Sequence, residues 1–253
     1  MLSEERRRAI LELLQADGRV LVRDLAKHFR TSLITIRKDL EFLHQQGQLE
    51  RSHGGALPVK TGALMDISLK EKERLRRQDK LRIAAAATRM IGKGQVIILD
   101  SGTTTTAIAR CCRQLRNLTV ITNAINIAAE LADSAVEVIM TGGVLRKNSF
   151  SLVGPLAEES LRKLSADLLF LAVDGFDVPY GLTTPNLLEA RANKAMAESA
   201  RRTVVVCDSS KFGRRSLSLI LSTSAVHECI TDKGIPKSDL KSLREAKVDV
   251  TLV

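Results

Sequence analysis

Apolar residues recur at helical spacing in three short stretches near the start of the chain. The pattern predicts helices over residues 3–16, 21–29 and 32–46, each with one apolar stripe turned toward a shared core. A tight turn between the last two helices is typical of a helix-turn-helix. In these two helices the residues expected to point inward are Leu21, Leu25, Phe29, Leu33, Ile36, Leu40 and Leu43.

A small hairpin is predicted directly after the third helix. Residues 49–52 form the first short strand, and Gly54-Gly55 turn the chain into a second one at Ala56-Leu57. Three helices followed by such a hairpin make a winged helix, which Pro58 closes.

Strands and helices alternate after a stretch with little periodicity. We therefore expect a DNA-binding domain over residues 1–58, a linker over 59–70 and an effector domain over 71–253 that opens with a helix at 71–91. The predicted strands are 95–100, 118–122, 136–141, 167–173, 203–208, 228–231 and 248–253. The helices between them include 103–115, 124–132, 187–201 and 236–246. Nearly continuous apolar strands separated by helices predict a mainly parallel α/β sheet that is covered on both faces.

The net charge of +10 is concentrated near the front of the chain. Residues 58–92 alone hold nine Lys/Arg against four Asp/Glu. A basic front end fits a polyanionic partner, although a merely basic surface is an equally good explanation of charge alone. Aromatic residues make up only 3%, which argues against recognition of single strands by stacking.

Cysteines and histidines form no cluster with metal-ligand spacing, so we expect no metal, no cofactor and no disulfide framework. The first residues lack the apolar core of a signal peptide, and the chain has no apolar run of 18 residues. We therefore expect a cytoplasmic protein without a membrane partner.

The third helix carries chemistry suited to double-stranded DNA. Hydroxyls near its start and cations further along are what a helix in the major groove needs to reach bases and phosphates. Asp39 is expected to orient Arg37 or Lys38, or to lie on the surface. Each polar residue taken singly is equally well explained as solvated surface.

The stretch S-x-x-T-I-R-K-D-L, followed by L-x-x-Q-G-x-L-x-R-x-H-G-G-A, resembles the N-terminal signature of the DeoR family of bacterial sugar-metabolism repressors. The resemblance implies DNA contacts from Ser32, Thr35, Arg37, Lys38, Arg51 and His53. Two residues depart from the usual pattern: Arg30 stands where Gly is common, and Lys38 where a second Arg is common. If Arg30 has a positive φ, the turn is strained.

Small and polar residues follow the strands of the predicted sheet. The strand at 95–100 runs into S-G-T-T-T-T and then a helix, an arrangement that suits a phosphate, although hydroxyls that only cap the helix are the plainer explanation. Because ligands of parallel sheets bind beyond the carboxyl ends of the strands, we expect these loops to meet. The candidate effector-binding residues are Asp100, Ser101, Gly102, Thr103, Thr104, Thr105, Thr122, Asn123, Gly142, Gly143, Asp174, Gly175, Glu189 and Lys211. Lys211 is the expected phosphate partner.

The second half of the chain is also similar to the DeoR-family effector domain, through L-D-S-G-T-T-T, V-D-G-F-D, G-L-T-T-P-N-x-x-E-A-R and D-S-S-K-F. This resemblance implies a ribose-5-phosphate-isomerase-like fold and a phosphorylated sugar as effector. The later motifs are closest to the amino-sugar branch that governs N-acetylgalactosamine use.

The expected function is that of a homo-oligomeric repressor of a carbohydrate operon. The main alternative is a sugar-phosphate isomerase with an added N-terminal domain, in which Asp174, Asp177, Glu189 and Lys211 supply acid and base. An enzyme has no need of a recognition helix and wing, and likeness of fold does not transmit chemistry. A third class, a purely architectural DNA binder, predicts no ligand site.

Overall fold

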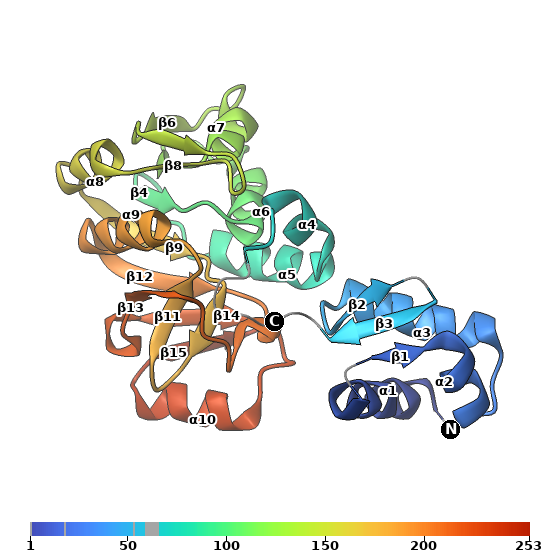
Figure 1. Cartoon of the computed structure of the whole chain (residues 1–253). Coiled ribbons are helices and arrows are strands. Elements are labelled where there is room, and N and C mark those ends of the chain that lie inside the picture. Colours follow the sequence, from blue (N-terminus) through green and yellow to red (C-terminus); the bar gives the residue numbers. More distant parts are fainter. Residues whose placement is uncertain (1, 18, 53, 59–65) are drawn as a thin grey trace. The chain divides into compact units, whose positions relative to one another are not determined.

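A computed structural model describes residues 2–17, 19–52, 54–58 and 66–253. The chain divides into two compact units, each described by itself below (Figure 1). The N-terminal unit comprises Met1–Thr61 and Arg74–Arg76, and the C-terminal unit comprises Gly62–Glu73 and Arg77–Val253. No helix among the described residues is long and apolar enough to cross a membrane.

The N-terminal unit is a winged helix. Its elements are α1 (Ser3–Asp17), β1 (Val20–Leu21), α2 (Val22–His28), α3 (Leu33–Gln45), β2 (Leu49–Ser52) and β3 (Gly55–Pro58). Strands β2 and β3 form the predicted antiparallel hairpin, with Ser52 opposite Gly55. The short strand β1, which the pattern did not predict, adds to β3 with Val20 opposite Ala56.

The predicted apolar stripes are mostly correct. The buried core of the N-terminal unit consists of Ile10, Leu14, Val20, Val22, Leu25, Ile36, Leu40, Leu43, Leu49 and Ala56, with Phe29 packed against it. Leu21 and Leu33 were expected to point inward, but they are 41% and 42% exposed. Leu21 belongs to β1, where Val20 is the buried neighbour, and Leu33 lies in the first turn of α3.

Asp39 is a structural residue, contrary to both expectations for it. Its carboxylate is 2% exposed and accepts hydrogen bonds from Arg6 Nε at 2.6 Å and Arg7 Nε at 2.9 Å. The Arg7 guanidinium also lies 3.7 Å from the centre of the Phe42 ring. Asp39 therefore ties α3 to α1 and does not orient Arg37 or Lys38.

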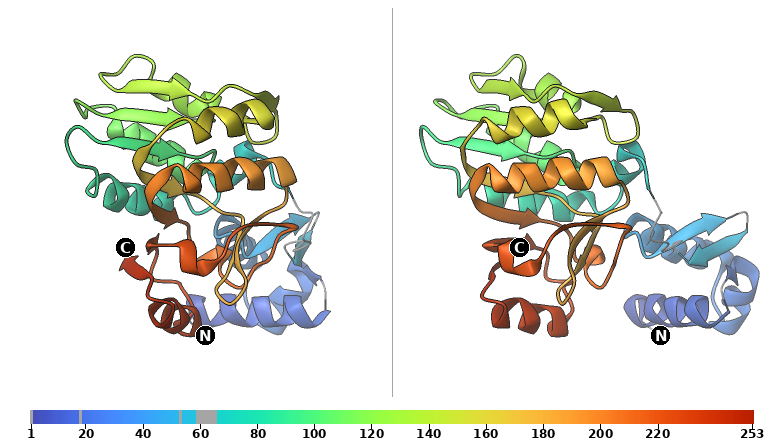
Figure 2. Two further views of the ribbon diagram at one scale, coloured as in Figure 1. Left: turned by 90° about the vertical axis from the view of Figure 1, so that its left-hand side faces the viewer. Right: turned by 60° about the vertical axis from the view of Figure 1, so that its left-hand side comes forward.

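The C-terminal unit is built on a seven-stranded parallel sheet with the order β15-β14-β12-β9-β4-β5-β6 (Figure 2). Its strands are β4 (Val96–Leu99), β5 (Thr119–Thr122), β6 (Glu137–Met140), β9 (Ala166–Leu171), β12 (Ala200–Val206), β14 (Glu228–Thr231) and β15 (Asp249–Leu252). The predicted mainly parallel α/β sheet is confirmed.

Helices cover both faces of this sheet (Figure 2). They are α5 (Arg77–Thr88), α6 (Thr103–Cys112) and α7 (Ile125–Leu131) on one face, and α8 (Pro155–Arg162), α9 (Leu187–Glu198) and α10 (Lys237–Glu245) on the other. Successive strand residues point to opposite faces, so Ile98 packs in one core and its neighbours Ile97 and Leu99 in the other. This alternation explains why the strands are apolar throughout.

The helix predicted over residues 71–91 is two helices. α4 (Leu69–Arg74) ends before α5 begins, and Arg76 between them has a φ of +53°. A residue in that left-handed region cannot continue a helix, so the chain turns there.

The sequence pattern also missed several short elements of the C-terminal unit. These are α8, a hairpin of β7 (Val144–Arg146) and β8 (Ser151–Val153), the short 3₁₀ turns at Ser209–Lys211 and Thr223–Ala225, and a three-stranded antiparallel sheet of β10 (Gly175–Asp177), β11 (Gly181–Thr184) and β13 (Ser218–Leu221).

Candidate functional sites

The start of α3 is set by a strained turn and a capping hydroxyl. Arg30 has a φ of +49°, as its place in the turn suggested. Ser32 is the N-cap: its Oγ accepts a hydrogen bond from Thr35 N at 3.1 Å and lies 2.9 Å from Thr35 Oγ1. Two of the predicted DNA-contacting residues thus also fix the first turn of the helix that carries them.

The outer face of α3 combines cations with apolar side chains. Arg37 and Lys38 are both exposed, as a DNA contact requires. Ile34 is 64% exposed on the same helix, and the sequence analysis gave it no role. An exposed apolar side chain beside cations suits contact with a thymine methyl group in the major groove. The signal was present in the sequence, since Ile34 falls outside the inward stripe.

The wing is tied to this helix. Arg51 on β2 donates hydrogen bonds from Nη1 to Arg37 O at 3.3 Å and to Glu41 Oε2 at 3.2 Å. Arg51 is therefore partly engaged within the unit, and its contact with DNA stays a prediction. His53, also predicted to contact DNA, lies outside the described residues.

The second site lies where the strand order of the parallel sheet reverses, between β4 and β9. Asp100 follows β4, and its Oδ1 accepts a hydrogen bond from Ala172 N, just after β9, at 3.1 Å. The side chain is 1% exposed, and its Oδ2 has no hydrogen-bond partner among the described residues. Burial raises the pKa of Asp100 to about 8, so this carboxyl is neutral at pH 7 and can donate a proton in a hydrogen bond.

The S-G-T-T-T-T segment begins α6 at this edge. Gly102 must lack a side chain, because a Cβ there would lie 2.7 Å from Ala172 Cβ. The hydroxyls of Thr105 and Thr106 donate to Gly102 O at 3.0 and 2.6 Å. These two hydroxyls thus serve the helix start itself.

The remaining hydroxyls of this segment differ in exposure. Thr104 is buried, whereas Ser101 and Thr103 are half-buried and stay closest to a surface.

The next two loops are largely occupied by structural contacts. Thr122 Oγ1 donates to Leu99 O at 2.7 Å, and Asn123 Nδ2 donates to Leu152 O at 3.0 Å; both side chains are fully buried. Gly142 and Gly143 have φ values of +70° and +118°. A Cβ at Gly143 would lie 2.7 Å from Val153 O, so this glycine permits a close approach of the backbone.

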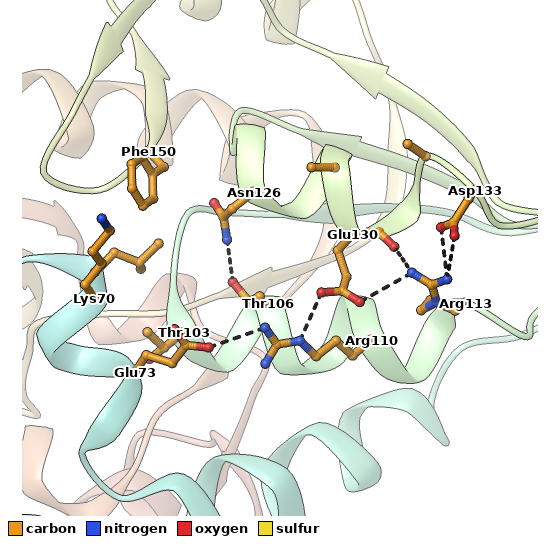
Figure 3. Close-up of a pocket in the computed structure, with 13 residues that line it drawn as sticks. Lys70, Glu73, Thr103, Thr106, Arg110, Arg113, Asn126, Glu130, Asp133 and Phe150 are labelled. Carbon is orange, nitrogen blue, oxygen red and sulfur yellow. Dashed lines mark hydrogen bonds and ion pairs between the residues drawn. The ribbon is translucent and has the colours of Figure 1, made fainter.

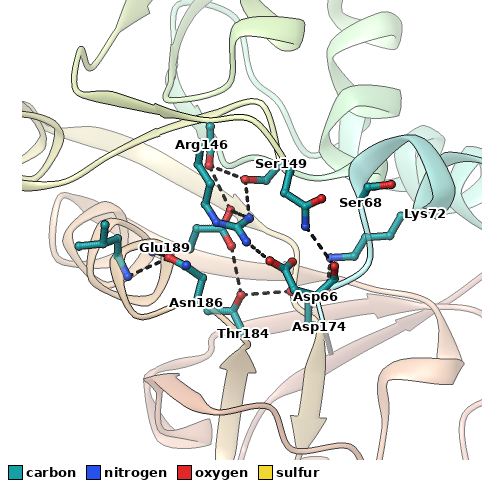
Figure 4. A network of polar contacts seen from close by, with 12 residues as sticks. Asp66, Ser68, Lys72, Arg146, Ser149, Asp174, Thr184, Asn186 and Glu189 are labelled. Atoms are coloured by element: carbon teal, nitrogen blue, oxygen red, sulfur yellow. Dashed lines mark hydrogen bonds and ion pairs between the residues drawn. The ribbon is translucent and has the colours of Figure 1, made fainter. Parts of the chain in front are cut away.

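Asp174 and Glu189 meet in a polar network (Figure 4). Thr184 Oγ1 donates to Asp174 Oδ2 at 3.1 Å and lies 3.5 Å from Glu189 Oε2. Glu189 Oε1 accepts from Arg146 Nη1 and from Ser151 Oγ, each at 3.1 Å. Asn186 caps α9 by accepting from the backbone N of residue 189 at 3.1 Å, which fixes the start of this helix.

Cations surround Asp174. Lys72 on α4 forms an ion pair with its Oδ1. Burial would raise the pKa of the Asp174 carboxyl, but the charges of Lys72 and Lys211 outweigh it and hold that pKa below its ordinary value. The predicted phosphate partner Lys211 thus lies near Asp174, as expected from the meeting of the loops.

Two more cations belong to the same edge. Lys80 is 7% exposed, and burial lowers its pKa to about 8, with the charges of Lys211 and Lys72 adding to the shift and Asp208 opposing it. Burial also lowers the pKa of Arg214, against the charges of Asp208 and Asp174.

We call Lys72, Lys80, Lys211 and Arg214 the cation cluster. Gly175 permits it, since a Cβ there would lie 2.4 Å from Arg214 O.

Three of the four members of the cation cluster were not predicted from the sequence, and neither was Arg146. No motif marks them, because Lys72 and Lys80 lie on two helices before the sheet and Arg146 on a hairpin. A charge count did contain a trace: residues 58–92, which include both lysines, are the most basic stretch of the chain.

A separate open hollow of about 640 Å³ lies between α4, α6 and α7 (Figure 3). Its charged side chains are largely paired with one another: Arg110 Nε lies 3.0 Å from Glu130, and Arg113 Nη2 lies 2.9 Å from Asp133. The hollow shares Thr103 with the effector candidates. Its balanced charge makes it a poorer place for a phosphate than the cation cluster.

Comparison with known proteins assigns both units. Residues 6–61 match the family described as the DeoR-like helix-turn-helix domain, and residues 75–233 match the DeoR C terminal sensor domain.

A putative aga operon transcriptional repressor of Escherichia coli O157:H7 is 44% identical over 99% of this chain and 94% of its own length. The HTH-type transcriptional regulator GlpR of Haloferax volcanii is 40% identical over 99% of this chain and 98% of its own. Among solved structures, a D-ribose-5-phosphate isomerase in complex with phospho-erythronic acid overlaps 54% of each chain with a TM-score of 0.42 and 14% identity. At that TM-score the likeness carries no information about chemistry.

Proposed function

Because the chain belongs to the DeoR family of transcriptional regulators, we propose that it is a repressor of a sugar-catabolic operon whose hold on DNA is controlled by a phosphorylated sugar. The predicted division is kept, with residues 1–58 for DNA and 71–253 for the effector. Such a regulator acts in the cytoplasm, where the operator lies.

The outer face of α3 supports the DNA-binding half of the proposal. Arg37 and Lys38 are exposed there beside Ile34, and the wing stands next to the helix through Arg51. Cations supply phosphate contacts and hold the register, while short hydroxyls and apolar groups reach base edges. A homo-oligomer would present two such faces to repeated half-sites on the DNA.

The cation cluster supports the effector half, and it is the observation on which the choice of ligand rests. Each of the four cations interacts electrostatically with Asp174, with Asp208 or with both. We place the phosphate beside these cations, with Ser101 and Thr103 at the start of α6 as further donors. Asp100, neutral at pH 7, and Glu189 are the side chains that we propose for the sugar hydroxyls.

The ligand is proposed to be an amino-sugar phosphate that weakens operator binding, since a catabolic repressor must release DNA when its sugar is present. The test is a gel shift with the promoter beside the protein's own gene, titrated with galactosamine 6-phosphate and N-acetylgalactosamine 6-phosphate. Unphosphorylated N-acetylgalactosamine is the matched control. Release of DNA by a phosphorylated sugar alone supports the proposal; operator binding that no phosphorylated sugar changes contradicts it.

We also propose that the protein is not an isomerase. This proposal rests on the DeoR-like helix-turn-helix at residues 6–61 and on the transcriptional regulators among the relatives, since an isomerase has no need of a DNA-binding unit. Incubation with ribose 5-phosphate and with both amino-sugar phosphates should give no new sugar phosphate in a coupled or chromatographic assay. Turnover at ordinary enzyme rates would reverse this conclusion.

A further inference from the structure

Helix α4 is held onto the candidate effector site by three contacts, one of them between Lys72 and Asp174, which are labelled in Figure 4. Lys72 Nζ forms an ion pair with Asp174, and Lys80 Nζ donates to Lys72 O. At the start of the helix, Leu69 N donates to Asn148 O at 2.9 Å. The helix thus rests on the residues that surround the proposed phosphate.

The residues just before α4 are fastened at the same place. Asp66 forms an ion pair with Arg146, whose Nη1 also reaches Glu189 at 3.1 Å. Asn148 Nδ2 donates to Asp66 O at 3.1 Å. The segment that enters the C-terminal unit is therefore bound to β7, to its hairpin loop and, through Arg146, to α9.

The C-terminal end of α4 is followed by residues that belong to the N-terminal unit. Glu73 pairs with Arg110 on α6 at 3.3 Å (Figure 3). The next three residues, Arg74–Arg76, pack with the N-terminal unit. There Arg76 N donates to Gln45 O at 3.0 Å, and Gln45 is the last residue of α3. Arg76 follows Lys72 closely in the sequence, so one short segment carries both the contact with Asp174 and the contact with Gln45.

We propose that α4 is a latch between the two sites: the effector's phosphate takes Lys72 from Asp174, α4 loosens, and the segment Arg74–Arg76 shifts at the end of α3. This inference rests on the proposed function. A phosphate and the Asp174 carboxylate are alternative anions for one ammonium group. Asp174, once released, is free to accept a hydrogen bond from a sugar hydroxyl.

The strength of the pair suits such an exchange. The side chains of Lys72 and Asp174 are 23% and 20% exposed, so a ligand can reach both. Most of each side chain is buried, so the attraction within the pair is partly offset by the loss of hydration, and a ligand that prefers the open form shifts the balance.

The first test is hydrogen exchange of the full-length protein with and without galactosamine 6-phosphate. The amides of Leu69 and Arg76 report the two ends of the latch, because each donates to a known carbonyl. Ligand should speed their exchange about tenfold, by raising the population of the open form. Amides of α10 serve as the internal reference, and galactosamine without phosphate should change neither end.

The second test uses variants of α4. In Lys72→Ala the latch is open without ligand, so operator affinity should fall about tenfold and galactosamine 6-phosphate should add little. Lys72→Arg restores a cation to Asp174 and should restore both affinity and response. Lys70→Ala, an exposed lysine on the same helix, should behave as the unchanged protein does.

The outcomes separate the latch from the proposed function. If the unchanged protein releases DNA with the phosphorylated sugar, but the amides of Leu69 and Arg76 keep their rates, the latch is wrong and the repressor stands. A Lys72→Ala variant that keeps full affinity and response has the same meaning. If the unchanged protein neither binds its promoter nor responds to the sugar, both proposals fall. The exchange measurement needs no variant, so poor folding of Lys72→Ala cannot obscure the answer.

Discussion

In the N-terminal unit, most side chains proposed to meet a ligand lie on the outer face of one helix, whereas in the C-terminal unit they are partly or fully buried and several are already paired with one another. Arg37 and Lys38 are exposed neighbours on α3. Lys72, Asp174 and Lys211 come from segments far apart in the sequence and meet only when the sheet has formed. The outer face of α3 can thus contact DNA without rearrangement. The candidate effector site, in contrast, must break existing ion pairs before it binds a sugar phosphate.

The most disruptive change in the N-terminal unit should be Asp39→Ala, although Asp39 touches no proposed ligand. Removing this carboxylate leaves Arg6 and Arg7 without their buried partner, which should lower the free energy of unfolding by about 3 kcal/mol. Thermal unfolding followed by far-UV circular dichroism measures the loss. Glu12→Ala, at an exposed position of α1, is the control and should stay within about 0.5 kcal/mol of the unchanged protein. Equal stability of the two variants would show that the ion pairs of Asp39 with Arg6 and Arg7 do not stabilise the fold.

The buried carboxyl of Asp100, in the candidate effector site, should make the stability of the C-terminal unit sensitive to pH. Native Asp100 keeps its proton up to about pH 8, whereas the unfolded chain releases it near its ordinary value. The stability that the protonated Asp100 contributes is therefore fully present in acid and is lost as pH rises toward 8, at about 1.4 kcal/mol per pH unit between pH 5 and pH 7. Asp100→Asn should remove this slope.

Urea unfolding followed by tyrosine fluorescence measures the stability of the C-terminal unit at each pH, since Tyr180 is the single tyrosine and the chain has no tryptophan. Asp249→Asn, on an exposed stretch of β15, is the matched control and should keep the slope. A slope that survives in Asp100→Asn would mean that another group holds the proton.

Substitutions on α3 should have a slightly smaller effect, on the free energy of operator binding. Arg37→Ala should weaken operator binding by about 2 kcal/mol if the side chain reads a base, and Lys38→Ala should lower the salt slope by about one unit if it meets a phosphate. Fluorescence anisotropy over a range of salt concentrations distinguishes the two roles. Lys241→Ala, on α10, removes the same charge from the other unit and should change neither quantity. An unaltered affinity in both α3 variants would place the DNA elsewhere.

The smallest of these effects should come from Lys211→Ala. Because one of four cations is lost, the affinity for the phosphorylated sugar should fall about tenfold, or by about 1.4 kcal/mol, while operator binding stays intact. The shift in melting temperature at saturating and half-saturating sugar measures the affinity. Lys194→Ala, on the exposed side of α9, is the control. Loss of operator binding in Lys211→Ala would contradict the division of labour between the units.

Patterns that repeat along the chain were enough to predict the winged helix and the parallel sheet, because both depend on local periodicity. The errors fall where a residue's setting depends on a distant segment. Asp39 reads as a surface residue until α1 brings Arg6 and Arg7 to it. The break at Arg76 was missed because the residues on both sides of it keep a helical pattern.

The candidate effector site divides in the same way. Asp100, Gly102 and Asp174 follow strands, so the topology of a parallel sheet predicts their edge. Lys72, Lys80 and Arg146 reach that edge from helices and a hairpin that no strand-end rule includes. Conversely, Thr122 and Thr105 lie at the predicted positions, but their hydroxyls donate hydrogen bonds to Leu99 O and Gly102 O within the fold.

The strand order also has a consequence for the newborn chain. Ile98 in β4 pairs with Leu169 in β9. During synthesis, β4 therefore cannot complete its pairing in the sheet until β9 has also been made. The winged helix is complete long before and depends mainly on contacts close in sequence, which favours early and fast folding. During each round of synthesis the cell should therefore hold, for a short time, a DNA reader whose sugar sensor does not yet exist.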